Sequence, residues 1–344
     1  MRRIVFPLLV AVGVAGIIVG GTRGGGEQEA TAVGDEVVVY SSRQEHLIRP
    51  LFERFTEETG IRVRYVTDNA GPLMARLQSE GRNTQADVFM TVDAGNLWQA
   101  TERDLLAPVD SEALEQAIPA HLRDPEGRWF GLSVRARTMV YSTERVDPEE
   151  LGSYADLADD QWQGRLCMRS SQSVYNQSLV AMLIATHGQE RAEEIVEGWV
   201  ANLAASPFSN DTSTMEAVAA GQCDVALVNT YYFGRLQSQD PDVPLAIHWA
   251  DQDGAGVHVN ISGAGITRHA RRPEAAQLLL EWLAGAEAQA LYGALNHEYP
   301  AREGIEREPL VASWGDFRMD DTNLAEAGRL QTQAVMLMDR AGYR

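Results

Sequence analysis

Lysine is missing from this sequence: all 29 of its basic residues are arginine. Lysine chemistry, including Schiff bases and the lysine of a Walker-type phosphate loop, is therefore excluded. The basic residues are also outnumbered by 49 Asp and Glu, which gives a formal net charge of −20. A chain of this charge repels phosphate backbones and anionic lipid, so we expect no nucleic-acid partner.

Catalytic motifs are missing as well. The sequence has no His-Glu-x-x-His zinc motif and no Gly-x-Ser-x-Gly nucleophile turn. Its seven His residues are scattered without metal-ligand spacing. We therefore expect a protein that is not an enzyme, and a secreted α/β hydrolase is the least favoured alternative.

Cysteine is scarce, because only Cys167 and Cys223 occur. In an oxidising compartment an even pair is most simply a disulfide, and two buried free thiols are the alternative. A disulfide would stabilise the fold by about 4 kcal/mol on the chain-entropy model. No histidine pattern lies near either cysteine, so a zinc site is not expected.

Long apolar runs are confined to the N-terminus. Two arginines precede an apolar run at residues 4–21, and a polar, glycine-rich stretch follows. This is the layout of an export signal, with Ala30-Thr31-Ala32 as the candidate cleavage site. The run is also long enough to serve as an uncleaved anchor. We therefore expect an exported, periplasmic protein, either released or tethered to the inner membrane through residues 1–32.

The rest of the chain reads as an α/β protein. Its 344 residues suit two lobes, and a hydrophobic content of 44% supports a sizeable core. Apolar periodicity predicts a helix over 45–59 that ends at Gly60, between short strands at 37–40 and 61–66. This alternation predicts a parallel sheet covered by helices. Further strands are expected at 86–90, 165–168, 224–229 and 257–266, and further helices at 71–80 and 273–283.

Three predicted strand ends carry polar residues and tyrosines, at 40–45, 170–178 and 229–234. Ligands of open α/β sheets bind beyond the carboxyl ends of strands, so this composition predicts a binding cleft. A single tyrosine near a strand end is more often a residue at the edge of the core. The adjacent Tyr231 and Tyr232 would point to opposite faces of an extended chain, so both face one cleft only if the chain turns there.

The residues around these strand ends resemble the ferric-ion-binding periplasmic proteins of ABC-type iron importers. The resemblance runs from about Val37 to the C-terminus, and its main carriers are VVVYSSRQEHLIRPLFERFTEETGI, GRLCMRSSQSVYNQSLVAML and GQCDVALVNTYYFGRL. It implies a type II periplasmic binding fold, in which two α/β lobes joined by hinge strands close on a ligand. It also implies a monomer that captures Fe(III) and delivers it to an inner-membrane ABC permease.

By motif, the tyrosine ligands of that family map onto Tyr175, Tyr231 and Tyr232. Fe(III) is a hard cation that prefers charged oxygen donors, and three tyrosinates would neutralise it. Because the reference pKa of a phenol is near 10, the metal must displace protons, so binding should weaken in acid. The expected bound species is Fe(III), with carbonate or another synergistic anion completing its coordination.

The chain departs from some relatives in the first loop, where they have His followed by Tyr. The corresponding positions here are Gln44, which offers a neutral oxygen, and Glu45, which offers a carboxylate or only stabilises the start of the next helix. Arg135 matches an arginine that some relatives place beside the metal or its anion, and Arg43 is a second candidate. The alternative function keeps the fold and binds a small oxyanion or organic ligand through these arginines.

The hinge strands implied by the resemblance divide the chain. Residues 134–141 are expected to carry it from the first lobe to the second, and residues 257–262 to return it. Lobe one would hold residues 33–135 and 258–300, and lobe two would hold residues 136–257 and 301–344.

Overall fold

A nine-stranded mixed sheet organises residues 34–344, which are the residues that the computed structural model describes. The export signal predicted for residues 1–32 lies outside them. The strand order is β2-β1-β3-β8-β4-β6-β5, and β7 and β9 also pair with β4. The strands are β1 (Glu36–Ser41), β2 (Arg62–Thr67), β3 (Val88–Val92), β4 (Phe130–Ser142), β5 (Leu166–Cys167), β6 (Val225–Asn229), β7 (Leu245–His248), β8 (Val259–Ile266) and β9 (Tyr299–Pro300).

The sheet is parallel only in part. Strands β1, β2 and β3 run parallel, as predicted, and β5 pairs with β6 in parallel. Strand β8 is antiparallel to β3, and β4 is antiparallel to both β8 and β6. The predicted parallel arrangement therefore holds for the first three strands and for β5 with β6, while the strands that connect the two halves of the sheet are antiparallel. The physical reason is that β8 brings the chain back from the other half of the sheet, so it meets β3 in the opposite direction.

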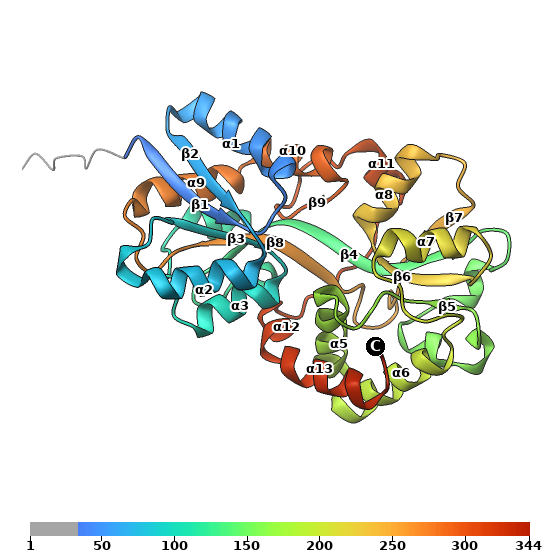
Figure 1. The fold of residues 1–344 in the computed structure, drawn as a ribbon. Coiled ribbons are helices and arrows are strands. Elements are labelled where there is room, and N and C mark those ends of the chain that lie inside the picture. The colour runs from blue at the N-terminus through green and yellow to red at the C-terminus, as the bar shows by residue number, and fades with distance from the viewer. Residues whose placement is uncertain (1–33) are drawn as a thin grey trace, which may run out of the picture. The chain divides into compact units, whose positions relative to one another are not determined.

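The long strand β4 joins the two halves of the sheet (Figure 1). Its first part pairs with β8 from Phe130 to Ala136, and its second part pairs with β6 from Arg137 to Tyr141. All of its residues are buried. The change of partner therefore falls between Ala136 and Arg137, within the stretch that was predicted to cross between lobes.

The hydrophobic core divides at the same place. One cluster combines the first β4 residues, up to Ala136, with side chains of β1, β3 and β8, and two others begin at Met139 and Val140. The C-terminal segment contributes to both sides, because Leu324 packs in the first cluster and Leu337 in the second. The lobe boundaries drawn from the sequence stay a prediction. A division into lobes that follows these clusters would separate β4 between Ala136 and Met139.

The helices follow the apolar periodicity where it was strongest. Helix α1 spans Glu45–Thr59 and is followed by Gly60, whose φ of 75° is the left-handed conformation that favours glycine. Among residues 34–344, no helix is long and apolar enough to cross a membrane. The other α-helices are α2 (Ala70–Glu80), α3 (Ala94–Glu102), α4 (Glu112–Ala117), α5 (Val174–His187), α6 (Gln189–Ala201), α7 (Asp211–Ala219), α8 (Thr230–Gln239), α9 (Pro273–Leu283), α10 (Ala286–Asn296), α11 (Pro309–Ser313), α12 (Ala325–Arg329) and α13 (Gln331–Arg340).

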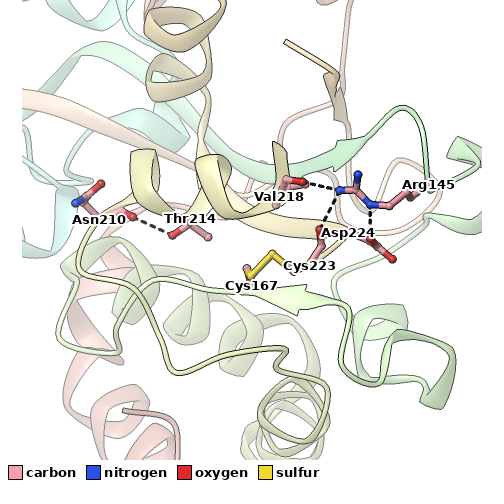
Figure 2. The surroundings of a disulfide bond; sticks show 7 residues. All are labelled: Arg145, Cys167, Asn210, Thr214, Val218, Cys223 and Asp224. Carbon is pink, nitrogen blue, oxygen red and sulfur yellow. Dashed lines mark hydrogen bonds and ion pairs between the residues drawn. A yellow bond between two sulfur atoms is a disulfide. The ribbon is translucent and has the colours of Figure 1, made fainter. Parts of the chain in front are cut away.

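Cys167 and Cys223 form a disulfide, with their Cα atoms 5.9 Å apart (Figure 2). The prediction of a disulfide is therefore confirmed, and the alternative of two free thiols is wrong. Cys167 ends β5 and Cys223 lies just before β6, the strand that pairs with β5 in parallel. The bond thus ties together the two strands that lead toward Tyr175 and Tyr231.

Candidate metal-binding site

A cavity of about 140 Å³ collects most of the residues predicted for the site. Its volume has room for an ion with a few small ligands. The predicted residues that line it are Arg43, Gln44, Arg135, Tyr175, Tyr231 and Tyr232, and the other polar residues that line it are Ser42, Arg235, Ser262, Asn296 and Glu298.

The three tyrosines lie in the first turns of two helices. Strand β6 ends at Asn229 and α8 begins at Thr230, so the chain turns where Tyr231 and Tyr232 require it. Neighbours on a helix differ in direction by about 100° rather than 180°, which lets both face one cavity. Their ring centroids are 4.3 Å apart. Tyr175 is the second residue of α5, and its hydroxyl oxygen lies 3.3 Å from that of Tyr231.

The surroundings of these phenols favour an anionic form once a cation is present. Helix N-termini carry partial positive charge, which stabilises anions in the first turn. The Arg135 guanidinium lies 5.2 Å from the Tyr175 ring centroid, and the Arg235 guanidinium lies 5.2 Å from that of Tyr231. Burial nevertheless raises the pKa of Tyr175 and of Tyr231, and the neighbouring tyrosines raise the pKa of Tyr231 further. Without a metal, these two phenols are therefore protonated at neutral pH.

The two predicted arginines differ in how their donors are used. Arg43 is buried and donates to Ser262 Oγ at 2.6 Å and to Glu298 Oε2 at 3.0 Å. Arg43 lacks a partner among the described residues only at Nε, whereas Arg135, which is also buried, lacks partners at both Nε and Nη2. A buried guanidinium with free donors is costly unless an anion pairs with it. Arg135 therefore fits an anion better than Arg43 does.

The first loop brings only one of its two predicted ligands to the cavity. Gln44 precedes α1 and lines the cavity. Glu45 is the first residue of α1, does not line the cavity, and accepts a hydrogen bond of 3.1 Å from the Tyr65 hydroxyl. In this structure Glu45 lies where a helix-stabilising carboxylate would lie, away from the three tyrosines.

Sequence reasoning missed two charged residues of the cavity. Arg235 lies four residues after Tyr231 on α8, so helical spacing alone would have placed both on one face. Glu298 follows α10, and no sequence motif around it indicated a binding residue. Burial raises the pKa of Glu298, but the charges of Arg43 and Arg135, together with hydrogen bonds from Ser133 and Arg43, outweigh burial and hold that pKa below its usual range. Glu298 is thus an ionised partner of Arg43.

The ligands of conventional metal sites do not gather in the described part of the chain. Within residues 34–344, no group of three or more His, Cys, Asp or Glu side chains is placed to hold a metal ion. The hydroxyls of Tyr175 and Tyr231 lie 3.3 Å apart in the cavity, and Tyr232 lines the same cavity.

Residues 51–319 match the family model of bacterial extracellular solute-binding proteins. The chain belongs to this family. The solute-binding protein is 42% identical to iron uptake protein A1 of Synechocystis, over 90% of this chain and 88% of that one. The structure of Trichodesmium IdiA (FutA) with iron and citrate matches it with a TM-score of 0.87 at 42% identity, covering 90% of this chain and 100% of that one.

A third match shows the same architecture. Mannheimia haemolytica ferric iron-binding protein A, solved in an open conformation, has a TM-score of 0.85 at 37% identity and covers 90% of this chain and 99% of its own. These neighbours are type II periplasmic binding proteins with two lobes, so the predicted fold class is confirmed. The predicted relationship to ferric-ion-binding periplasmic proteins is confirmed as well.

Proposed function

We propose that this solute-binding protein captures Fe(III) in the periplasm and delivers it to an inner-membrane ABC permease. The observation that carries the proposal is the convergence of Tyr175, Tyr231 and Tyr232 in one cavity, at the N-termini of two helices. Relatives that are named an iron uptake protein and an Fe(3+)-binding periplasmic protein support the same cargo. The protein acts as a monomer, released or tethered through residues 1–32.

The charges of the cavity support a ferric ion accompanied by an anion. Three tyrosinates would offset the charge of Fe(III), and Glu298 already offsets that of Arg43. Arg135 and Arg235 remain, and both line the cavity. A carbonate or a carboxylate of a small chelate would neutralise them while supplying further oxygen ligands, and Arg135 has the free donors to hold it.

The position of the tyrosines supports an order of binding. All three belong to the part of the chain assigned to lobe two, residues 136–257 and 301–344. Arg43 and Gln44 belong to lobe one, residues 33–135 and 258–300. The metal binds the tyrosines first, and lobe one then closes over it with Gln44 and the Arg43–Glu298 pair. No enzymatic step is needed for capture and delivery.

A second candidate keeps the fold and changes the ligand to a small oxyanion. The free donors of Arg135 favour it. Titration with ferric citrate separates the two, because tyrosinate-to-iron charge transfer gives a visible absorption band. We expect a coloured complex at one iron per chain. Binding of citrate or carbonate alone, with no colour on adding iron, would move the oxyanion to first place.

A further inference from the structure

A buried polar network centred on Arg137 binds residues that adjoin the tyrosines in sequence. Arg137 is 2% exposed. Its guanidinium donates to Asn176 Oδ1 at 2.8 Å, to Asp211 Oδ2 at 3.0 Å and to Asn229 Oδ1 at 3.2 Å. It also donates to the carbonyl oxygen of Leu227 at 3.0 Å. One side chain therefore binds four partners that come from three separate segments of the chain.

Two of these partners adjoin the tyrosines in sequence. Asn176 follows Tyr175 in the first turn of α5, and Asn229 precedes α8, two residues before Tyr231. Asp211 reinforces the second link, because its Oδ2 also accepts from the backbone N–H of Asn229 at 2.9 Å. The starts of both tyrosine-bearing helices are thus fixed to the same guanidinium.

The C-terminus completes the network. The Nδ2 of Asn176 donates to the hydroxyl of Tyr343 at 2.6 Å, and that hydroxyl donates to the carbonyl oxygen of Arg169. Arg169 itself lies over the Tyr175 ring, 5.4 Å from its centroid, and 3.8 Å from the Asp211 carboxylate. Tyr343, the second-last residue of the sequence, therefore holds the turn that leads into Tyr175.

Arg137 lies on β4 at the point where this strand changes its pairing partner. It is the first residue of β4 that pairs with β6, and Asn229 is its register partner. Two residues earlier on the same strand, Arg135 lines the cavity. A shift of Arg137 would therefore move the tyrosine helices and the candidate anion site together.

We propose that Arg137 is a positioning residue that sets the relative geometry of Tyr175, Tyr231 and Tyr232 through Asn176, Asn229 and Asp211. This inference rests on the proposed function of the cavity. Residues that orient metal ligands without touching the metal typically change metal affinity by about 10- to 100-fold when replaced. The Arg137 network holds the first turns of both α5 and α8, which carry the three tyrosines.

The test replaces the Arg137–Asp211 ion pair as a whole, Arg137→Met together with Asp211→Asn, so that neither member of this pair is left buried without its partner, while the partly exposed Arg169 keeps its charge. Fe(III) affinity, the charge-transfer maximum and the melting temperature are measured for the whole chain. The matched control is Arg145→Met with Asp224→Asn, which removes an ion pair of 2.8 Å beside the disulfide (Figure 2). Neither residue lines the cavity. Amide exchange at residues 174–178 and 229–234 is followed in the metal-free proteins.

We expect both variants to fold, the Arg137 variant to bind Fe(III) about 10- to 100-fold more weakly with a displaced charge-transfer band, and the control to keep the wild-type band. A folded Arg137 variant with wild-type affinity and spectrum would overturn the inference. A colourless wild-type protein would instead overturn the proposed function. Faster amide exchange in the Arg137 variant than in the control would still support positioning in that case, and equal exchange would refute it.

A second variant decides the matter if the Arg137 variant does not fold. Tyr343→Phe removes one hydroxyl from the network and leaves Asn176 its acceptors at Arg169 and Ser170. We expect a smaller shift of the charge-transfer band and faster amide exchange at residues 174–178. An unchanged spectrum together with unchanged exchange would count against the inference.

Discussion

The two walls of the cavity are built on different principles. The tyrosine wall consists of Tyr175, Tyr231 and Tyr232, three phenols at helix starts. The facing wall consists of Arg43, Gln44, Ser262, Asn296 and Glu298, where Arg43 and Asn296 both donate to the Glu298 carboxylate. The phenol oxygens of the tyrosine wall are available to bind a cation. The charged groups of the facing wall, Arg43 and Glu298, already pair with each other.

This difference indicates where the binding energy for a metal resides. A phenol that loses a proton becomes a strong ligand, while a carboxylate held by an arginine must first give up that partner. The tyrosine wall should therefore dominate affinity, and the facing wall should close the cavity and exclude water. The disulfide joins the two strands that lead toward the tyrosine wall, and the sequence has no other cysteine that could cross-link the facing wall.

The largest expected effect comes from removing two donors of the tyrosine wall. The double change Tyr231→Phe and Tyr232→Phe keeps both rings and removes both oxygens, so the fold should survive. Fe(III) binding should weaken by more than about 100-fold, since even indirect changes near a metal cost 10- to 100-fold. The visible band should fade in an equilibrium titration. Undiminished colour in this variant would show that the ligands lie elsewhere.

Proton release is the next measurement of the same wall. Burial raises the pKa of Tyr175 and Tyr231 above the usual phenol value, so both hold their protons at neutral pH before the metal arrives. Because Fe(III) displaces protons, affinity must fall as the pH falls. We expect about three protons per iron in a weakly buffered titration at neutral pH. Release of none would contradict tyrosinate coordination.

The disulfide gives a sizeable effect on stability rather than on affinity. Replacing both Cys167 and Cys223 by alanine should lower the free energy of unfolding by about 2–4 kcal/mol. Urea unfolding measures the loss, and a thiol assay on the unfolded, unreduced wild type should find no free thiol. Two titratable thiols would contradict the bond.

A smaller and conditional effect is expected at Arg135. Arg135→Ala removes donors that have no partner among the described residues. Loss of a hydrogen bond to a charged group costs about 1.5–3 kcal/mol, so Fe(III) affinity should fall by roughly 10- to 100-fold in carbonate buffer. In carbonate-free buffer the variant and the wild type should bind alike. Equal losses in both buffers would argue against a synergistic anion at this residue.

The smallest effect belongs to Glu45, which lies outside the cavity. Glu45→Gln removes a helix-end charge worth about 0.3–1 kcal/mol to stability. Melting should shift slightly and Fe(III) affinity should stay at the wild-type value. A large loss of affinity would mean that Glu45 moves onto the metal when the cavity closes.

Local sequence determined much of this protein. Apolar periodicity was sufficient for α1 and α9, because each helix buries one face, α1 is followed by Gly60, and α9 begins at Pro273. The disulfide was predictable because the sequence has two cysteines and an export signal that directs it to an oxidising compartment. The three tyrosines were recognised through family motifs around Tyr175 and Tyr231, and all of them line one cavity.

Tertiary structure alone decided the rest. The antiparallel course of β8 depends on how the chain returns between the halves of the sheet, which no local pattern encodes. Glu298 and Arg43 meet across 255 residues of sequence. Only the fold could show that Arg43 forms an ion pair with Glu298 while two donors of Arg135 have no partner among the described residues, since pairing of buried charges depends on which distant segments share one low-dielectric site. Sequence named the donors of the site, and packing decided which of their charges stay free for a ligand.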